Sequence, residues 1–148
     1  MLMIPALALV VACSADSTTE PVALRQAEAV SASGNYSFSI TPENSTVRVQ
    51  FSRVRSSGDE SIGAFMQRVF DSADAAGATR LVVDLSATRG GDAFLAPSLV
   101  KGVMARAHFS RRGGLIVILG PDSFSPGQST AKLLQEYAQP IFVKHPIS

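Results

Sequence analysis

The sequence predicts an α/β fold in which parallel strands alternate with helices. Three short apolar runs rich in β-branched residues are typical of buried strands, and they cover residues 81–85, 115–119 and 141–143. Stretches with helical spacing lie between these runs, an order that is typical of βαβ units in a mainly parallel sheet. With 148 residues, 46% of them hydrophobic and 17% charged, the chain suits a single globular domain.

An earlier strand and helix complete the expected pattern. Val47, Val49 and Phe51 alternate with polar residues, which predicts a half-buried strand. Ser57 and Glu60 have the spacing of a capping box at a helix start, and Gly77 is a suitable stop for that helix. Its apolar face is expected to comprise Ile62, Phe65, Met66, Val69, Phe70 and Ala73.

Two further helices are expected, over about residues 95–108 and 128–138, and each follows a glycine-containing loop. Right-handed crossovers would put these loops, residues 86–92 and 120–127, at the carboxyl ends of their strands. Because open α/β sheets bind ligands at that edge, the two loops are the predicted site.

The amino-terminal residues have the character of an export signal. Residues 1–12 are apolar and uncharged, too short a run to span a bilayer but typical of a signal-peptide core. The segment Val-Val-Ala-Cys13 resembles a lipobox, which implies a lipid anchor on Cys13. Residues 13–35 are rich in Ser, Thr and Ala and are expected to form a flexible tether to a folded domain over residues 36–148. Ser14 after the cysteine favours the outer membrane, with the domain facing the periplasm.

Composition excludes several classes of function. The net charge of +1 provides no basic surface for nucleic acid. Two His and one Cys make a zinc site improbable, and no cofactor is expected. The sequence does not indicate an oligomeric state.

Each loop has a catalytic and a purely structural interpretation. Gly90 and Gly91 can expose backbone amides that stabilise an oxyanion, or they can simply form a turn. Ser125 can hold a nucleophilic hydroxyl clear of the sheet, or it can serve as a turn or helix-cap residue. A serine nucleophile needs a base. His108 is expected at the end of a helix. Lys144 and His145 follow Val143 in the last strand, where they could reach the loop of Ser125 and provide the base, or could simply be a solvated basic pair.

Three segments in order resemble the C-terminal processing (tail-specific) serine peptidases. LVVDLSATRGGD, at residues 81–92, is similar to the family segment DLRxNxGG. SFSPGQ, at residues 123–128, resembles the nucleophile segment (T/R)FSAA(Q/S), and AQPIFVKHP, at residues 138–146, resembles xAxxVGEP. The resemblance implies a crotonase-like core, Ser125 as nucleophile, Gly90 or Gly91 in the oxyanion hole and an extended peptide or protein segment as substrate.

The same resemblance exposes departures from the family. The family's Lys base follows the GEP turn at a position beyond Ser148, so the catalytic core is expected to be incomplete at its carboxyl end. Pro126 occupies the position whose amide serves the family as an oxyanion donor, and proline has no N–H. The alternatives are therefore an inactive, lipid-anchored peptide-binding protein of the same fold, and a hydrolase or acyl-binding protein of the wider crotonase-like group.

Overall fold

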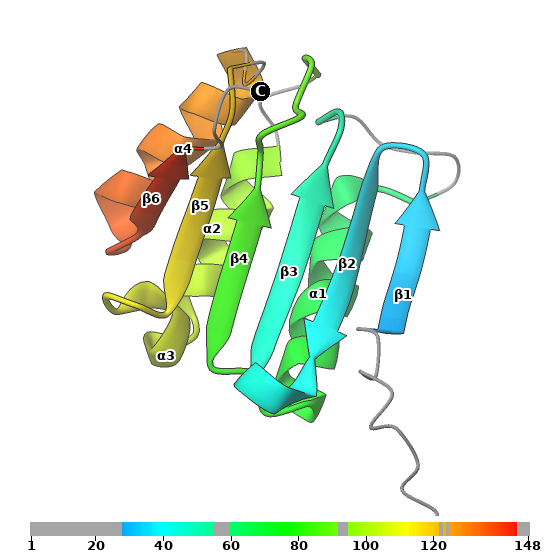
Figure 1. Ribbon diagram of the computed structural model, residues 1–148, viewed down its shortest axis with the longest axis vertical. Coiled ribbons are helices and arrows are strands. Elements are labelled where there is room, and N and C mark those ends of the chain that lie inside the picture. Colours follow the sequence, from blue (N-terminus) through cyan, green and yellow to red (C-terminus); the bar gives the residue numbers. More distant parts are fainter. Residues whose placement is uncertain (1–27, 55–59, 92–94, 122, 124, 145–148) are drawn as a thin grey trace, which may run out of the picture.

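A computed structural model describes residues 28–54, 60–91, 95–121, 123 and 125–144. They form one six-stranded sheet whose strands are arranged in chain order, with helices between the parallel strands (Figure 1). The strands are β1 (Glu28–Ser33), β2 (Tyr36–Thr41), β3 (Thr46–Phe51), β4 (Arg80–Asp84), β5 (Leu115–Leu119) and β6 (Ile141–Lys144). The helices are η1 (Pro42–Asn44), α1 (Ile62–Ala75), α2 (Leu95–Met104), α3 (Ala107–Ser110) and α4 (Ser125–Tyr137).

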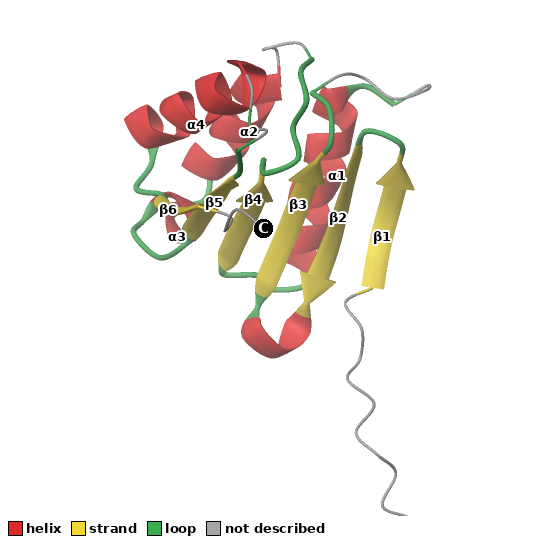
Figure 2. Ribbon diagram, turned by 45° about the horizontal axis from the view of Figure 1, so that its top comes forward, coloured by secondary structure: helices red, strands yellow, loops and turns green. Residues whose placement is uncertain are grey.

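The sheet combines an antiparallel and a parallel half. Strands β1, β2 and β3 form an antiparallel meander, whereas β3, β4, β5 and β6 pair in parallel. The long helices α1, α2 and α4 cover one face of the sheet (Figure 2). The expected α/β class with a mainly parallel sheet is therefore confirmed.

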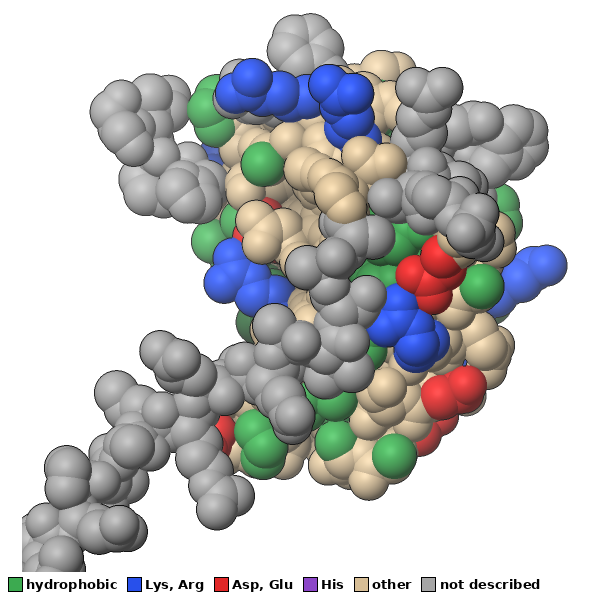
Figure 3. All heavy atoms as spheres, turned by 90° about the vertical axis from the view of Figure 1, so that its right-hand side faces the viewer, with side chains coloured by type: hydrophobic (Ala, Val, Ile, Leu, Met, Phe, Trp, Pro, Cys, Tyr) green, Lys and Arg blue, Asp and Glu red, His purple; other side chains and the backbone are tan. Residues whose placement is uncertain are grey.

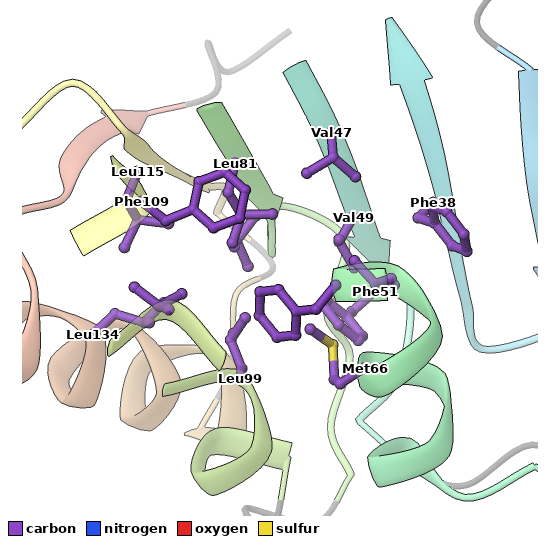
Figure 4. Close-up of a cluster of buried hydrophobic side chains, with 14 of the residues drawn as sticks. Phe38, Val47, Val49, Phe51, Met66, Leu81, Leu99, Phe109, Leu115 and Leu134 are labelled. Carbon is purple, nitrogen blue, oxygen red and sulfur yellow. The ribbon is translucent and has the colours of Figure 1, made fainter. Parts of the chain in front are cut away.

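The core lies between the sheet and these helices. Alternate residues of the strands point to the helix-covered face and are buried. Among them, Val49, Val83 and Val117 are aligned across β3, β4 and β5. They pack against apolar residues of the helices, among them Met66, Leu99 and Leu134 (Figure 4). The alternating and continuous apolar runs of the sequence are thus explained by a sheet covered by helices on this face.

Helix α1 follows the sequence pattern but begins differently. All six residues of its predicted apolar face are buried, and Gly77 just beyond its end has φ +63°. Its N-cap is Ser61, whose hydroxyl accepts a hydrogen bond from the amide of Ala64 over 3.2 Å. The predicted cap Ser57 lies outside the described residues, and Glu60 instead accepts hydrogen bonds of 2.8 Å from Arg68.

Three other expectations need correction. The tether predicted over residues 13–35 does not extend that far, because Glu28–Ser33 form strand β1 of the sheet. The single helix predicted over residues 95–108 is divided into α2 and α3 at Arg106, whose side chain donates to the carbonyl oxygen of Gly102. The last strand, β6, was expected to be buried because it is an apolar run, yet all four of its residues are exposed.

Surface charge is dispersed. On the side of the molecule next to β1, the described Lys, Arg, Asp and Glu side chains are scattered among polar and apolar atoms (Figure 3). Among the described residues, no helix has the length and apolar character needed to cross a membrane.

Candidate functional site

Both predicted loops lie at the carboxyl ends of adjacent parallel strands. One follows Asp84 at the end of β4, and the other follows Leu119 at the end of β5. Ser125 is the first residue of α4, and it is exposed at this edge of the sheet. We call the described parts of the two loops, residues 85–91, 120, 121 and 123, together with the first turn of α4, the carboxyl rim.

Two buried hydroxyl groups fasten the rim to the strands. The Thr88 hydroxyl donates to the carbonyl oxygen of Phe51, the last residue of β3, over 3.0 Å. The Ser123 hydroxyl donates to the carbonyl oxygen of Leu85, just beyond β4, over 2.8 Å. Thr88 is 0% exposed and Ser123 is 6% exposed. Each loop is therefore held against the end of the neighbouring strand by one hydroxyl.

Ser123 also closes the turn that leads into α4. Its hydroxyl oxygen accepts from the amide of Gly120 over 2.8 Å, and its own amide donates to the carbonyl oxygen of Gly120 over 3.1 Å. The side chain of Gln128 then donates to the carbonyl oxygen of Ser123 over 3.1 Å. These bonds fix the backbone two residues before Ser125.

Glycines allow the two loops to approach closely. A Cβ atom added at Gly127 would lie 3.6 Å from the Cβ of Thr88. A Cβ added at Gly120 would lie only 2.6 Å from the carbonyl oxygen of Ser86, closer than a real Cβ atom comes. The structure therefore brings the β5 loop and the start of α4 against the loop that carries Gly90 and Gly91.

The glycine pair extends this loop beside the end of β3. Gly90 and Gly91 have φ values of +103° and +133°, and Gly91 forms a parallel bridge with Val54. Arg89 donates its amide to the carbonyl oxygen of Ser52, and Val54 donates to that of Gly90, both over 3.0 Å. Both glycines thus lie in a loop whose backbone is held to the extension of β3. Backbone amides in such a loop can in general donate to an anionic oxygen.

Asp84 is a buried charge with several partners beneath the rim. It accepts hydrogen bonds from the amide and the hydroxyl of Ser86, over 3.0 and 2.6 Å, and it forms an ion pair with Arg48. Burial opposes ionisation, but the bonds from Ser86 and Arg48 outweigh it and hold the pKa of Asp84 below its ordinary value. The carboxylate is therefore ionised, and its hydrogen bonds to Ser86 hold the loop against β4. A charge within an apolar strand is expected to have such partners.

The two described candidates for a general base, His108 and Lys144, lie at opposite ends of the strands. His108 is in α3, just before the start of β5, and its ring lies 4.3 Å from that of Phe109. It is therefore at the edge opposite Ser125 (Figure 1). Lys144 is the last residue of β6 and is aligned with Leu119, so it lies at the same edge as the rim. His145, Asp92 and Cys13 are outside the described residues.

A groove of about 340 Å³ lies between α1 and α2, bordered by Gln67, Ser98 and Lys101, and no residue of the rim lines it. Among the described residues, no three His, Cys, Asp or Glu side chains are close enough to hold a metal ion together.

Sequence reasoning expected Ser125 and the glycine pair at this edge of the sheet, where the structure places them, but it assigned no role to the buried Ser123 and Thr88. Both are hydroxyl residues in loops, where most such residues form exposed turns, and nothing in the pattern marks these two as buried. Comparison with other proteins yielded no known family and no curated protein that matches this chain.

Proposed function

We propose that this chain is the core of a serine-type peptidase of the tail-specific type, built on a crotonase-like β/α unit. Ser125 is its nucleophile, and its substrate is an extended segment of a peptide or protein. The observation that carries the proposal is the approach of α4 to the glycine loop, where Gly127 lies against Thr88. Ser125 and Gly90 are each only two residues from this contact.

The chemistry would begin with attack of the Ser125 Oγ on a peptide carbonyl carbon. A new C–O bond forms, a base takes the hydroxyl proton, and the carbonyl oxygen becomes an oxyanion. The amides of Gly90 and Gly91 would donate to this oxyanion. Collapse of this intermediate breaks the C–N bond, the base gives its proton to the leaving amine, and water then hydrolyses the acyl-enzyme. Lys144 and His145, at the carboxyl end of β6, are the candidates for the base within this sequence.

Rigidity of the rim supports this assignment. Catalytic donors act efficiently when they are already oriented before the charge develops. The buried hydroxyls of Ser123 and Thr88 provide such an orientation, because they tie both loops to strand ends. The amino end of α4, a helix of 13 residues, adds a favourable dipole for negative charge.

A second function is favoured by one specific residue. Pro126, buried in the first turn of α4, cannot donate a hydrogen bond to an oxyanion beside Ser125. Loss of one such donor lowers kcat about 10²–10³-fold in serine peptidases. The alternative function is therefore a lipid-anchored protein that binds peptides without cleaving them. In either case Cys13 would carry the lipid, with the domain facing the periplasm.

The test is covalent labelling of the full chain with a fluorophosphonate probe. The proposal predicts labelling of the wild type that Ser125→Ala abolishes. Ser129→Ala is the matched control, since Ser129 is an exposed serine one turn later in α4 and its loss should leave labelling unchanged. Labelling that survives Ser125→Ala would reject Ser125 as nucleophile. A wild type that binds extended peptides but does not react would favour the second function.

A further inference from the structure

The groove between α1 and α2 has the lining of a small-molecule site. The two helices lie side by side over the covered face of the sheet (Figure 2). The floor of the groove is formed by Met66 and Phe70, which are almost fully buried, and its walls carry the polar side chains of Gln67, Ser98 and Lys101. Its volume of about 340 Å³ is at the lower end of the range for ligand sites, which combine an apolar surface with a few polar groups.

Two glycines shape this groove. At Gly102 a Cβ atom would lie 1.9 Å from Cε2 of Phe70, so the ring fits only because α2 has no side chain there. At Gly63 sterics do not require glycine, since a Cβ would lie 3.8 Å from the Ser98 hydroxyl oxygen, an ordinary contact. Alanine is the better helix former. The effect of glycine at position 63 is to leave the groove wider at this end.

One of the two cations that line the groove is already neutralised. The Nε of Arg106 donates to a carboxylate oxygen of Asp74 over 2.8 Å, and its guanidinium lies 4.6 Å from the centre of the Phe70 ring. The hydrogen bond from Arg106 holds the pKa of Asp74 below its ordinary value, so the carboxylate is ionised beside its partner. This pair closes the end of the groove and leaves no net charge there.

The other cation, Lys101, is exposed on α2 and forms no ion pair within the part of the chain that the structure describes. Asp71 does not line the groove, and it accepts a hydrogen bond of 2.8 Å from the side chain of Gln67. Ser98 lies three residues before Lys101, a spacing that makes the two side chains neighbours on the helix surface. The groove therefore presents one positive charge and one hydroxyl above an apolar floor.

We propose that this groove binds a small molecule that carries a single carboxylate on an apolar body. The carboxylate pairs with the Nζ of Lys101 and accepts a hydrogen bond from the hydroxyl of Ser98. The apolar body lies over Met66 and Phe70. One cation matches one carboxylate, and the modest volume suits a body of about the size of one aromatic side chain. Because no residue of the carboxyl rim lines the groove, the inference is independent of the role of Ser125.

Two kinds of molecule share this chemistry. One is a free aromatic or aliphatic acid, and the other is the carboxyl-terminal residue of a short peptide. The peptide adds a main-chain amide next to its last residue. Gln67 uses its side-chain nitrogen to reach Asp71, so its carbonyl oxygen is the acceptor that the groove offers to such an amide.

The first experiment titrates the ¹⁵N-labelled full chain with 3-phenylpropionate and follows amide shifts by NMR. Saturable shifts are expected in residues 63–70 and 98–106, with a Kd on the order of 1 mM or tighter. Lys101→Met should raise this Kd about threefold or more, as the loss of an exposed ion pair implies. Lys132→Met, at an exposed lysine of α4, is the matched control and should leave the Kd unchanged. The neutral analogue 3-phenylpropanol should bind more weakly than the acid.

Three results would overturn the proposal. They are the absence of saturable shifts in the groove, an unchanged Kd in Lys101→Met, and equal affinity for the acid and the alcohol. A comparison of 3-phenylpropionate with N-acetyl-alanyl-phenylalanine separates the two sources of the carboxylate. Tighter binding of the dipeptide assigns the site to peptide ends, whereas weaker binding assigns it to free acids.

The second experiment fills the groove without removing its charge. Ser98→Leu adds an apolar side chain to the wall beside Gly63 and should abolish binding of 3-phenylpropionate, while circular dichroism shows that the fold is retained. Ser129→Leu, on the exposed side of α4, makes the same substitution away from the groove and should bind as the wild type does. Binding that persists in Ser98→Leu would show that the ligand lies elsewhere.

Discussion

The hydroxyl oxygen of Ser123 lies 2.8 Å from both the carbonyl oxygen of Leu85 and the amide nitrogen of Gly120. One buried atom therefore joins the end of β4 to the turn that follows β5. Both partners are backbone groups that lie close to strand ends, where the ladder of the sheet no longer pairs them. The serine-bearing turn thus depends on a side chain that is not itself part of the proposed chemistry.

Replacement of Ser123 by Ala should therefore destabilise the fold. It would leave the amide of Gly120 without its bond and the Leu85 carbonyl without this donor, at a cost of about 1–3 kcal/mol. Ser129→Ala, at an exposed position of α4, should change the free energy of unfolding by less than about 0.5 kcal/mol. Urea denaturation of both variants measures this difference. Equal stabilities would show that the Ser123 bonds contribute nothing.

Gly91 is expected to tolerate no side chain. Its φ of +133° belongs to a region that only glycine adopts readily, and a Cβ there would lie 2.1 Å from the carbonyl oxygen of Val54. Gly91→Ala should cost more than about 3 kcal/mol, since backbone strain and a steric clash add. Gly113 has φ +87° and no atom within 4 Å of an added Cβ, so Gly113→Ala should cost about 1–2 kcal/mol. Thermal unfolding of the two variants tests this order.

Asp84 predicts how stability depends on pH. Its pKa is lower in the folded chain than the ordinary value of 3.8, so its contribution is fully present above that value and is lost as pH falls through the folded pKa. Asp84→Asn should reduce the free energy of unfolding at pH 7 by about 1–2 kcal/mol, a modest figure because Arg48 is half-exposed. The gap between wild type and variant should narrow below pH 4. A constant gap from pH 7 to pH 2 would contradict this account.

The sequence predicts the parallel half of the sheet well. Strands β3, β4 and β5 and helix α1 each bury one regular face, and that regularity is visible as alternation or helical spacing. The hairpin of β1 and β2 is much less visible. Its residues Glu28–Ser33 are rich in Ala and Ser, a composition shared with flexible linkers, and its strand character comes from pairing with Tyr36–Thr41.

The site is predictable in position but not in detail. Topology alone places Gly90 and Ser125 at the same edge, because parallel strands end there together. The burial of Ser123 and Thr88 depends on distances between loops that no local pattern encodes. The exposure of β6 could not be predicted from the sequence for a related reason. An apolar run becomes a buried strand only when other elements cover it, and the run itself does not show whether they do.

Pro126 offers the sharpest test of whether the rim can support catalysis. If Ser125 is a nucleophile limited by a missing oxyanion donor, Pro126→Ala restores an amide at that position and should raise the rate of fluorophosphonate labelling by up to about 10²-fold. The backbone can accept this change, since alanine is an excellent helix former. Pro42→Ala, in the distant helix η1, should leave the labelling rate unaltered and so controls for proline loss in general. Faster labelling in Pro126→Ala must also disappear in the double variant with Ser125→Ala. A rate in Pro126→Ala that equals the wild-type rate would mean that this amide position does not face the reacting oxygen.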